Sequence, residues 1–169
     1  MRIRIILLLI LGTSEFCYSQ IKDEIKKQVQ VVVDATLAHH YETVIEKTYP
    51  SLIKLMGGKE IALKTITDGM NNLESQNIRL DSVIIGTPRD IYIAGDELHV
   101  LVPETLVMST PKGKLVTLSY SLAISKDDGV TWLFLDVGER TNKNIVDLLP
   151  NFNNDLIIPP KQKPILYSK

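Results

Sequence analysis

Hydrophobic residues follow a helical period in the first half of the chain and a strand period in the second half. Residues 21–39 place apolar side chains on one side, with most of the lysines and acids opposite them, which predicts an amphipathic helix. A second helix is predicted over residues 41–48, and Pro50 opens a short turn of helix that reaches residue 55. Residues 59–76 repeat the amphipathic pattern. Helices therefore precede any strand.

After residue 77 the pattern becomes that of β-strands. Gly-, Pro- and Asp-containing turns separate the predicted strands, which cover residues 78–85, 91–94, 98–108, 115–124 and 131–137. Short turns between consecutive strands predict antiparallel pairing. In the clearest strand one face is predicted to be buried and the other is more polar. The apolar face carries Val116, Leu118, Tyr120, Leu122 and Ile124, and the other carries Thr117, Ser119, Ser121 and Ser125.

Prolines predict irregular backbone at two places. Pro103 has no N–H to donate to a neighbouring strand, so the long third strand is predicted to bend or bulge there. A short helix is predicted over residues 144–149. Residues 150–169, which include Pro159, Pro160 and Pro164, are predicted to form an extended tail over the surface that does not pair regularly.

This order of elements predicts an α+β fold in which N-terminal helices pack on a strongly curved antiparallel sheet of about four to six strands. Residues 20–149 are long enough to form one domain around a single core.

The first nineteen residues have the layout of a secretory signal peptide. Arg2 and Arg4 precede an apolar run over residues 5–11, and Cys17 and Ser19 stand at the −3 and −1 positions of a cleavage site. We therefore expect cleavage after Ser19 and export to the periplasm or the extracellular space. The apolar run is much shorter than the roughly 20 residues that cross a bilayer, so no stable membrane span is expected.

Cys17 also raises the alternative of lipoprotein processing, although Glu15 and Phe16 stand where a lipobox requires small residues. It is the only cysteine of the chain, so the mature protein is expected to have neither a cysteine nucleophile nor a thiolate metal site. The formal net charge is −1, and such a balanced charge argues against nucleic acid as a partner.

The segment SKDDGVTW, residues 125–132, matches the Asp-box pattern S-x-D-x-G-x-T-W of sialidases at every specified position. Aspartate side chains in such a segment cap the amides of a tight turn, Gly129 supplies a positive φ angle, and Trp132 packs beneath the hairpin. Sialidase propellers carry several boxes, whereas this chain has one. We therefore interpret the segment as a structural hairpin, with calcium or glycan binding as the alternative.

The element order over about residues 20–139 resembles the nuclear-transport-factor-two-like superfamily, which has a cone-shaped, cystatin-like α+β roll. The segments TYPSLIKLMGGKE (residues 48–60) and DDGVTWLFLD (residues 127–136) are similar to those of small exported bacterial proteins of this type. The resemblance implies a pocket enclosed by helices and sheet, and it makes a homodimer through the sheet credible. Superfamily members differ in function, so the fold alone selects none.

The expected function is non-catalytic: binding of a small apolar or amphipathic ligand, or contact with a protein partner through the sheet. The predicted ligand-binding residues are the large side chains expected to line the roll, namely Tyr92, Leu118, Tyr120, Leu122, Trp132 and Phe134.

A small cofactor-independent isomerase or dehydratase is the alternative. It would use His99 and Asp136 in one cavity, with Asp136 on the strand face that carries Trp132 and Phe134, and with Tyr92 or Tyr120 polarising a carbonyl. This alternative requires that His99 and Asp136 point into the same space. Further candidates for the pocket rim are Glu104, Glu139 and Arg140, for which surface positions are the simpler interpretation.

No metal or cofactor is expected. His39 and His40 are adjacent and point about 100° apart on a helix, so they cannot chelate one ion together. The segment MGGKE, residues 56–60, suggests an anion-binding loop but lacks the phosphate-loop spacing and follows a helix. Helix termination at the two glycines explains it more simply.

Overall fold

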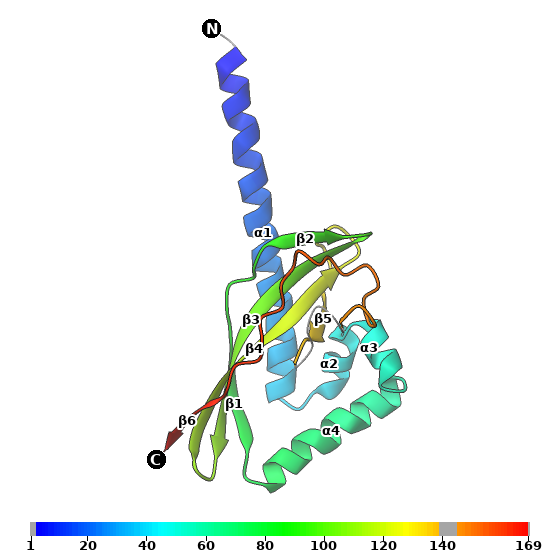
Figure 1. The fold of residues 1–169 in the computed structure, drawn as a ribbon, viewed down its shortest axis with the longest axis vertical. Helices are drawn as coiled ribbons and strands as arrows, with labels where there is room; N and C mark the ends of the chain where they lie inside the picture. Colours follow the sequence, from blue (N-terminus) through cyan, green and yellow to red (C-terminus); the bar gives the residue numbers. More distant parts are fainter. Residues whose placement is uncertain (1–2, 139–144, 169) are drawn as a thin grey trace.

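The computed structural model describes residues 3–138 and 145–168, with side chains from residue 19 onward. The chain forms helices first and strands afterwards (Figure 1). The helices are α1 (Ile3–Leu37), α2 (Tyr41–Lys47), α3 (Pro50–Leu55) and α4 (Lys59–Ser75). The strands are β1 (Arg79–Ile85), β2 (Ile91–Ala94), β3 (Glu97–Thr110), β4 (Gly113–Ser125), β5 (Leu133–Asp136) and β6 (Ile165–Ser168).

The strands form one curved antiparallel sheet that is not closed into a barrel, which confirms the predicted fold class. The long strands β3 and β4 lie at its centre. On the outer side of β3, β2 pairs with the beginning of the strand and β1 with its end. On the outer side of β4, β6 pairs with the beginning and β5 with the end. Each long strand therefore has two different partners along its outer edge.

Helix α1 covers one face of the sheet (Figure 1). Ile25 and Val29 of α1 are buried against this face. Their partners on and beside the sheet are Val100, Val102, Ala123, Trp132 and Phe134. The periodicity of residues 21–39 thus predicted Ile25 and Val29 of the buried stripe of α1, because residues four apart lie on one side of a helix.

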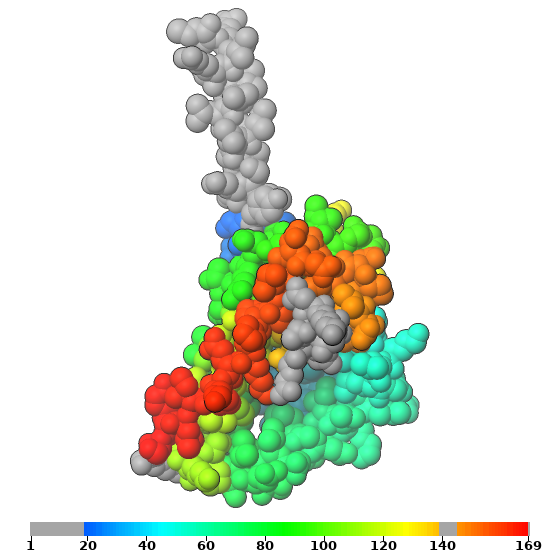
Figure 2. Space-filling view, in the orientation of Figure 1, coloured from blue at the N-terminus to red at the C-terminus, as the bar shows by residue number. Residues whose placement is uncertain are grey.

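The C-terminal segment, residues 145–164, covers the opposite face of the sheet. This position differs from the prediction of a tail on the surface. It runs across the molecule, as the orange and red atoms of Figure 2 show. Phe152, Leu156 and Ile158 are 5%, 1% and 7% exposed and belong to the core. They pack with strand residues such as Leu101 and Leu122. The segment has an irregular backbone, but its apolar side chains cover this face of the sheet as a helix would.

The last residues of the chain also correct the prediction, because β6 pairs regularly with the beginning of β4. Gly113 stands opposite Ser168, with a φ angle of 135°. A side chain at Gly113 would overlap the carbonyl oxygen of Tyr167. The missing Cβ therefore allows the end of the chain to join the sheet.

Pro103 does not produce the predicted bulge, since β3 and β4 keep one register through the pair Pro103 and Tyr120. The outer partner of β3 changes at this point, because pairing with β2 stops at Val100 and pairing with β1 starts at Glu104. Pro103 therefore lies between the two outer partners, where its lack of an N–H breaks no pairing between strands. Its carbonyl accepts a hydrogen bond from the amide of Gly86 at 2.7 Å. The irregular register lies in β1, between Leu80 and Ser82.

Helix α1 begins much earlier than the predicted helix and is continuous from residue 3. The leucine-rich N-terminal run explains the extension, because leucine is a strong helix former. Within the part of the chain that the structure describes, no helix is long and apolar enough to cross a membrane.

Candidate functional site

A cavity of about 190 Å3 lies between α1 and the sheet. Its apolar wall comes from α1, β1, β3 and β5 and consists of Val29, Val32, Val33, Leu80, Val83, Leu106 and Phe134. Its polar groups lie on α1 and on three neighbouring strands, and they are Thr36, Glu104, Ser119, Ser121 and Asp136. We call this space the α1 cavity. A mostly apolar hollow with a few polar groups is the usual form of a small-molecule site.

The sheet register explains how the polar groups meet in the α1 cavity. Glu104 of β3 pairs with Ser119 of β4, and Ser121 of β4 pairs with Asp136 of β5. Paired residues of an antiparallel sheet point to the same face, and so do residues two apart on a strand. Four polar side chains from three adjacent strands therefore share one wall.

Glu104 is an acid of this wall whose carboxyl is perturbed by its surroundings. Burial raises the pKa of its carboxyl, a hydrogen bond with Ser121 partly opposes that rise, and the nearby charge of Asp136 adds to it. Asp136 accepts a hydrogen bond at 2.8 Å from the backbone N–H of Gly138. Sequence reasoning placed Glu104 at a pocket rim but favoured a surface position. Glu139 and Arg140, named with it, lie outside the described residues.

The structure does not bring His99 and Asp136 together. His99 pairs with Ile124 on β4, which stands opposite Leu133, whereas Asp136 pairs with Ser121. Alternate residues of a strand point to opposite faces, so His99 faces the C-terminal segment and Asp136 faces the α1 cavity. The shared cavity that the enzyme alternative requires is absent for this pair. Asp136 does share its face with Phe134, as predicted.

His99 belongs instead to a buried cluster centred on the Glu97 carboxylate. Glu97 accepts hydrogen bonds from the Tyr49 hydroxyl at 2.7 Å and from His99 Nε2 at 3.0 Å. Lys126 Nζ lies 3.0 Å from the same carboxylate. The cluster joins the connection between α2 and α3, strand β3 and the Asp-box hairpin.

Electrostatics fix the charge states in this Glu97 cluster. Burial would raise the pKa of Glu97, but hydrogen bonds from Tyr49, His99 and Lys126 outweigh burial and hold the pKa below its usual range. Burial lowers the pKa of His99 despite the opposing carboxylate, so the ring is neutral and donates from Nε2. Its Nδ1 atom has no hydrogen-bond partner within the described residues, and the Phe152 ring lies 5.8 Å away. Tyr49, Glu97 and His99 are buried, so this cluster links three segments inside the core.

The predicted ligand-binding residues do not line one cavity. Trp132 and Phe134 lie on the α1 face, and Phe134 alone of the six reaches the α1 cavity. The other four, Tyr92, Leu118, Tyr120 and Leu122, lie on the opposite face, where Leu118 and Tyr120 border a separate hollow of about 170 Å3. Leu122 and Trp132 have no exposed surface. The alternation in β4 identified two faces correctly but did not tell which face α1 covers.

The Asp-box segment forms a hydrogen-bonded turn between β4 and β5. Asp127 Oδ1 accepts from the hydroxyl of Ser125 and from the amide of Thr131, each at 2.8 Å. Asp127 Oδ2 accepts from the Thr131 hydroxyl, and Trp132 Nε1 donates to the carbonyl of Gly129 at 3.0 Å. Gly129 has a φ angle of 90°, which explains the requirement for glycine.

Gln28 of α1 holds the turn to the helix. Its side chain accepts from the amide of Trp132 and donates to the carbonyl of Val130, both at 2.9 Å. The oxygens of Asp127 are used within the turn, which agrees with a structural role for the Asp box.

The Asp127→Ala variant tests this role through pH. Hydrogen bonds from Thr131 and Ser125 lower the pKa of Asp127 from 3.8 to about 2. A carboxyl whose pKa is lowered by folding stabilises the fold at any pH above its pKa in the unfolded state. This contribution to stability is lost as the pH falls from about 4 to about 2. We expect the variant to be less stable than the wild type at pH 6 and the difference to narrow toward pH 2. Urea unfolding at several pH values measures it. Asp23→Ala, which removes an exposed carboxylate from α1, controls for net charge, and a gap that stays constant with pH contradicts the role.

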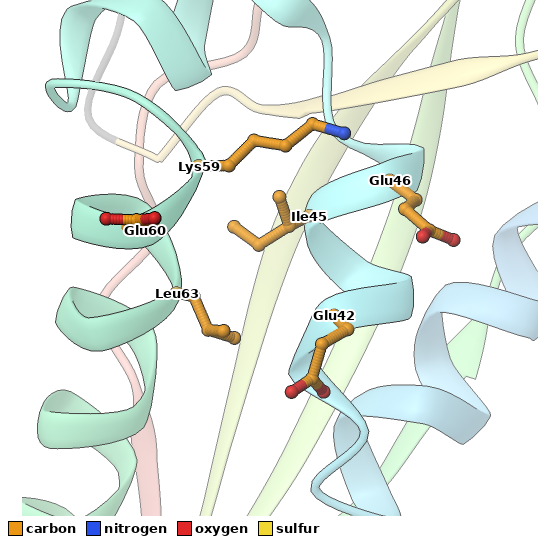
Figure 3. Close-up of a pocket in the computed structure, with 6 residues that line it drawn as sticks. All are labelled: Glu42, Ile45, Glu46, Lys59, Glu60 and Leu63. Carbon is orange, nitrogen blue, oxygen red and sulfur yellow. The ribbon is translucent and has the colours of Figure 1, made fainter.

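A second hollow of about 180 Å3 lies between α2 and α4 (Figure 3). Ile45 and Leu63 form its apolar floor, and the Lys59 side chain extends across it toward α2 (Figure 3). Glu42, Glu46 and Glu60 also border it. Both charge signs occur at this rim, so the groove shows no preference for one kind of charge.

The remaining candidates have structural explanations. The amide of Gly58 donates to the carbonyl of Ile53 at 2.9 Å, which closes α3 as the helix-termination interpretation predicts. His39 and His40 are both exposed, and His39 Nε2 lies 3.4 Å from the Glu74 carboxylate. Among the residues with described side chains, no three His, Cys, Asp or Glu groups are placed to hold a metal ion.

Comparison with protein-family models, with curated proteins and with solved structures finds no match to this chain. The resemblance to the nuclear-transport-factor-two-like superfamily therefore stays a prediction, and function must be inferred from the cavity.

Proposed function

We propose that this protein is an exported, non-catalytic binding protein that holds a small amphipathic molecule in the α1 cavity. The observation that carries the proposal is the cavity itself: seven apolar side chains surround one polar wall on the sheet. Its volume equals that of about six water molecules at ~30 Å3 each, which suits a single ring with a short substituent. An apolar body would contact α1 and β1 while a polar group meets β3 and β4.

Export is compatible with this site. Every α1 residue that lines the cavity, from Val29 to Thr36, follows the expected cleavage point after Ser19. Removal of residues 1–19 would therefore leave the cavity wall complete. The non-catalytic part of the proposal is supported by the separation of His99 from Asp136 on opposite faces of the sheet.

The Val32→Phe and Val31→Phe variants test the binding proposal as a matched pair. Val32 lines the cavity, whereas its neighbour Val31 is 45% exposed. A phenyl group at position 32 would fill the space, so we expect saturation-transfer NMR to detect binding of cyclohexanol or phenol by the wild type and Val31→Phe. Val32→Phe should lose this binding.

Native mass spectrometry of protein purified from its own host would also give the mass of any compound that the protein retains. If the wild type binds none of the probes, or if Val32→Phe binds them as well as the wild type does, the cavity is not the binding site.

A homodimer through the sheet stays a prediction, and the surface proposed for it changes. Ser119 and Ser121 of the hydroxyl-rich face line the α1 cavity, so they do not form an open surface. The exposed apolar residues Ile84, Ile165 and Tyr167 on the opposite face of β1 and β6 offer the better surface.

A further inference from the structure

We infer that the ligand of the α1 cavity is a primary amine on a compact apolar body, held through its ammonium group by Glu104. The inference rests on the proposed function and names the chemistry of the ligand. It starts from the polar wall, where Glu104 is partly buried and directed into an otherwise largely apolar space.

The charge of the cavity is one-sided. None of the twelve side chains that line it is a lysine, arginine or histidine. Burial and the nearby charge of Asp136 raise the pKa of Glu104, which means that the surroundings of this carboxyl disfavour its ionised form. An ammonium ligand would supply the positive charge and restore the ionised form. An anionic ligand would bring a further negative charge toward Glu104 and Asp136 and would be repelled.

The number of hydrogen-bonding groups also fits an ammonium ion. An ammonium group has three N–H donors and no acceptor. Glu104 offers a carboxylate, and the neighbouring Ser119 and Ser121 on β4 offer hydroxyl oxygens on the same wall. Adjacent strands lie about 4.8 Å apart, so one small cation can contact groups from both. Hydrogen bonds between charged partners are also the stronger ones, and they give an amine an advantage over an alcohol of the same shape.

The test compares three ligands that share one ring and differ in charge: cyclohexylamine, cyclohexanol and cyclohexanecarboxylate. NMR titration of the full chain at pH 7 should give a dissociation constant for the amine at least about tenfold below that of the alcohol, with the carboxylate weakest. Glu104→Gln should abolish the amine preference, so that in this variant the amine binds no more tightly than the alcohol does. Glu42→Gln removes a carboxylate from the separate α2–α4 groove and should leave amine binding unchanged.

The outcomes separate the two proposals. If the alcohol binds and the amine binds no better, the amine inference fails and the proposed function stands. If the amine preference survives in Glu104→Gln, Glu104 is not the group that holds it. If none of the three ligands binds the wild type, both proposals fail. The wild-type comparison needs no variant, and the amide spectrum of Glu104→Gln reports whether that variant is folded.

Discussion

Replacing Glu97 by alanine is expected to lower the free energy of unfolding by about 3 kcal/mol. The substitution removes the acceptor of the Tyr49 hydroxyl and of His99 Nε2, both of which lie in the core. Each buried donor left without a partner costs about 1–3 kcal/mol. Urea unfolding of the variant and the wild type measures the difference.

Lys126→Ala is the matched control for Glu97, because it removes the third partner of the same carboxylate. The Lys126 side chain is 61% exposed, and an exposed ion pair is worth less than about 1 kcal/mol. The Glu97 variant should therefore be clearly the less stable of the two. Equal losses would mean that the exposed ion pair, and not the buried hydrogen bonds, carries the stability of the cluster.

Trp132→Ala is expected to cost about 3–5 kcal/mol, the largest loss in the Asp-box segment. Trp132 has no exposed surface and packs in the core between α1 and the sheet. Its removal leaves a cavity and also leaves the carbonyl of Gly129 without its indole donor. The measurement is again urea unfolding of the two proteins.

Val130→Ala provides the comparison within the same turn. Val130 is 67% exposed, so its replacement should change stability by no more than about 0.5 kcal/mol. If Trp132→Ala were as mild as Val130→Ala, the Asp box would not hold the core together, and its match to the sialidase pattern would need a binding explanation such as calcium or glycan.

Local periodicity predicted most of the elements closely. The predicted short helix over residues 50–55 and the predicted strand over residues 91–94 coincide with α3 and β2. Prolines, glycines and the change from a helical to a strand period mark these boundaries, and all of them act over a few residues. The same local chemistry identified the hydrogen-bonded turn around Asp127 and Gly129, because the capping groups lie within four residues of the amides they bind.

The candidate site was predicted less well, since it depends on contacts between distant segments. Sequence reasoning grouped Leu122 with Phe134 and His99 with Asp136, and the sheet register places each pair on opposite faces. Which face of β4 continues into which face of β5 depends on how the two strands pair. The periodicity within one strand carries no information about this pairing. No local sequence pattern distinguishes Glu104 from a surface acid. It becomes part of a cavity only because α1 packs over its face of the sheet.

The sequence by itself determined the order of the elements from α1 to β5, the antiparallel sheet and the structural use of the Asp box, because short-range spacing and backbone preferences decide these features. Only the tertiary structure decided that α1 covers the hydroxyl-bearing face of β4 and that Phe152 and Leu156 cover the apolar face. Alternation along a strand shows that it has two faces, whereas the partner of each face is chosen by burial between segments far apart in the chain. That choice places Glu104, Ser119 and Ser121 in the α1 cavity.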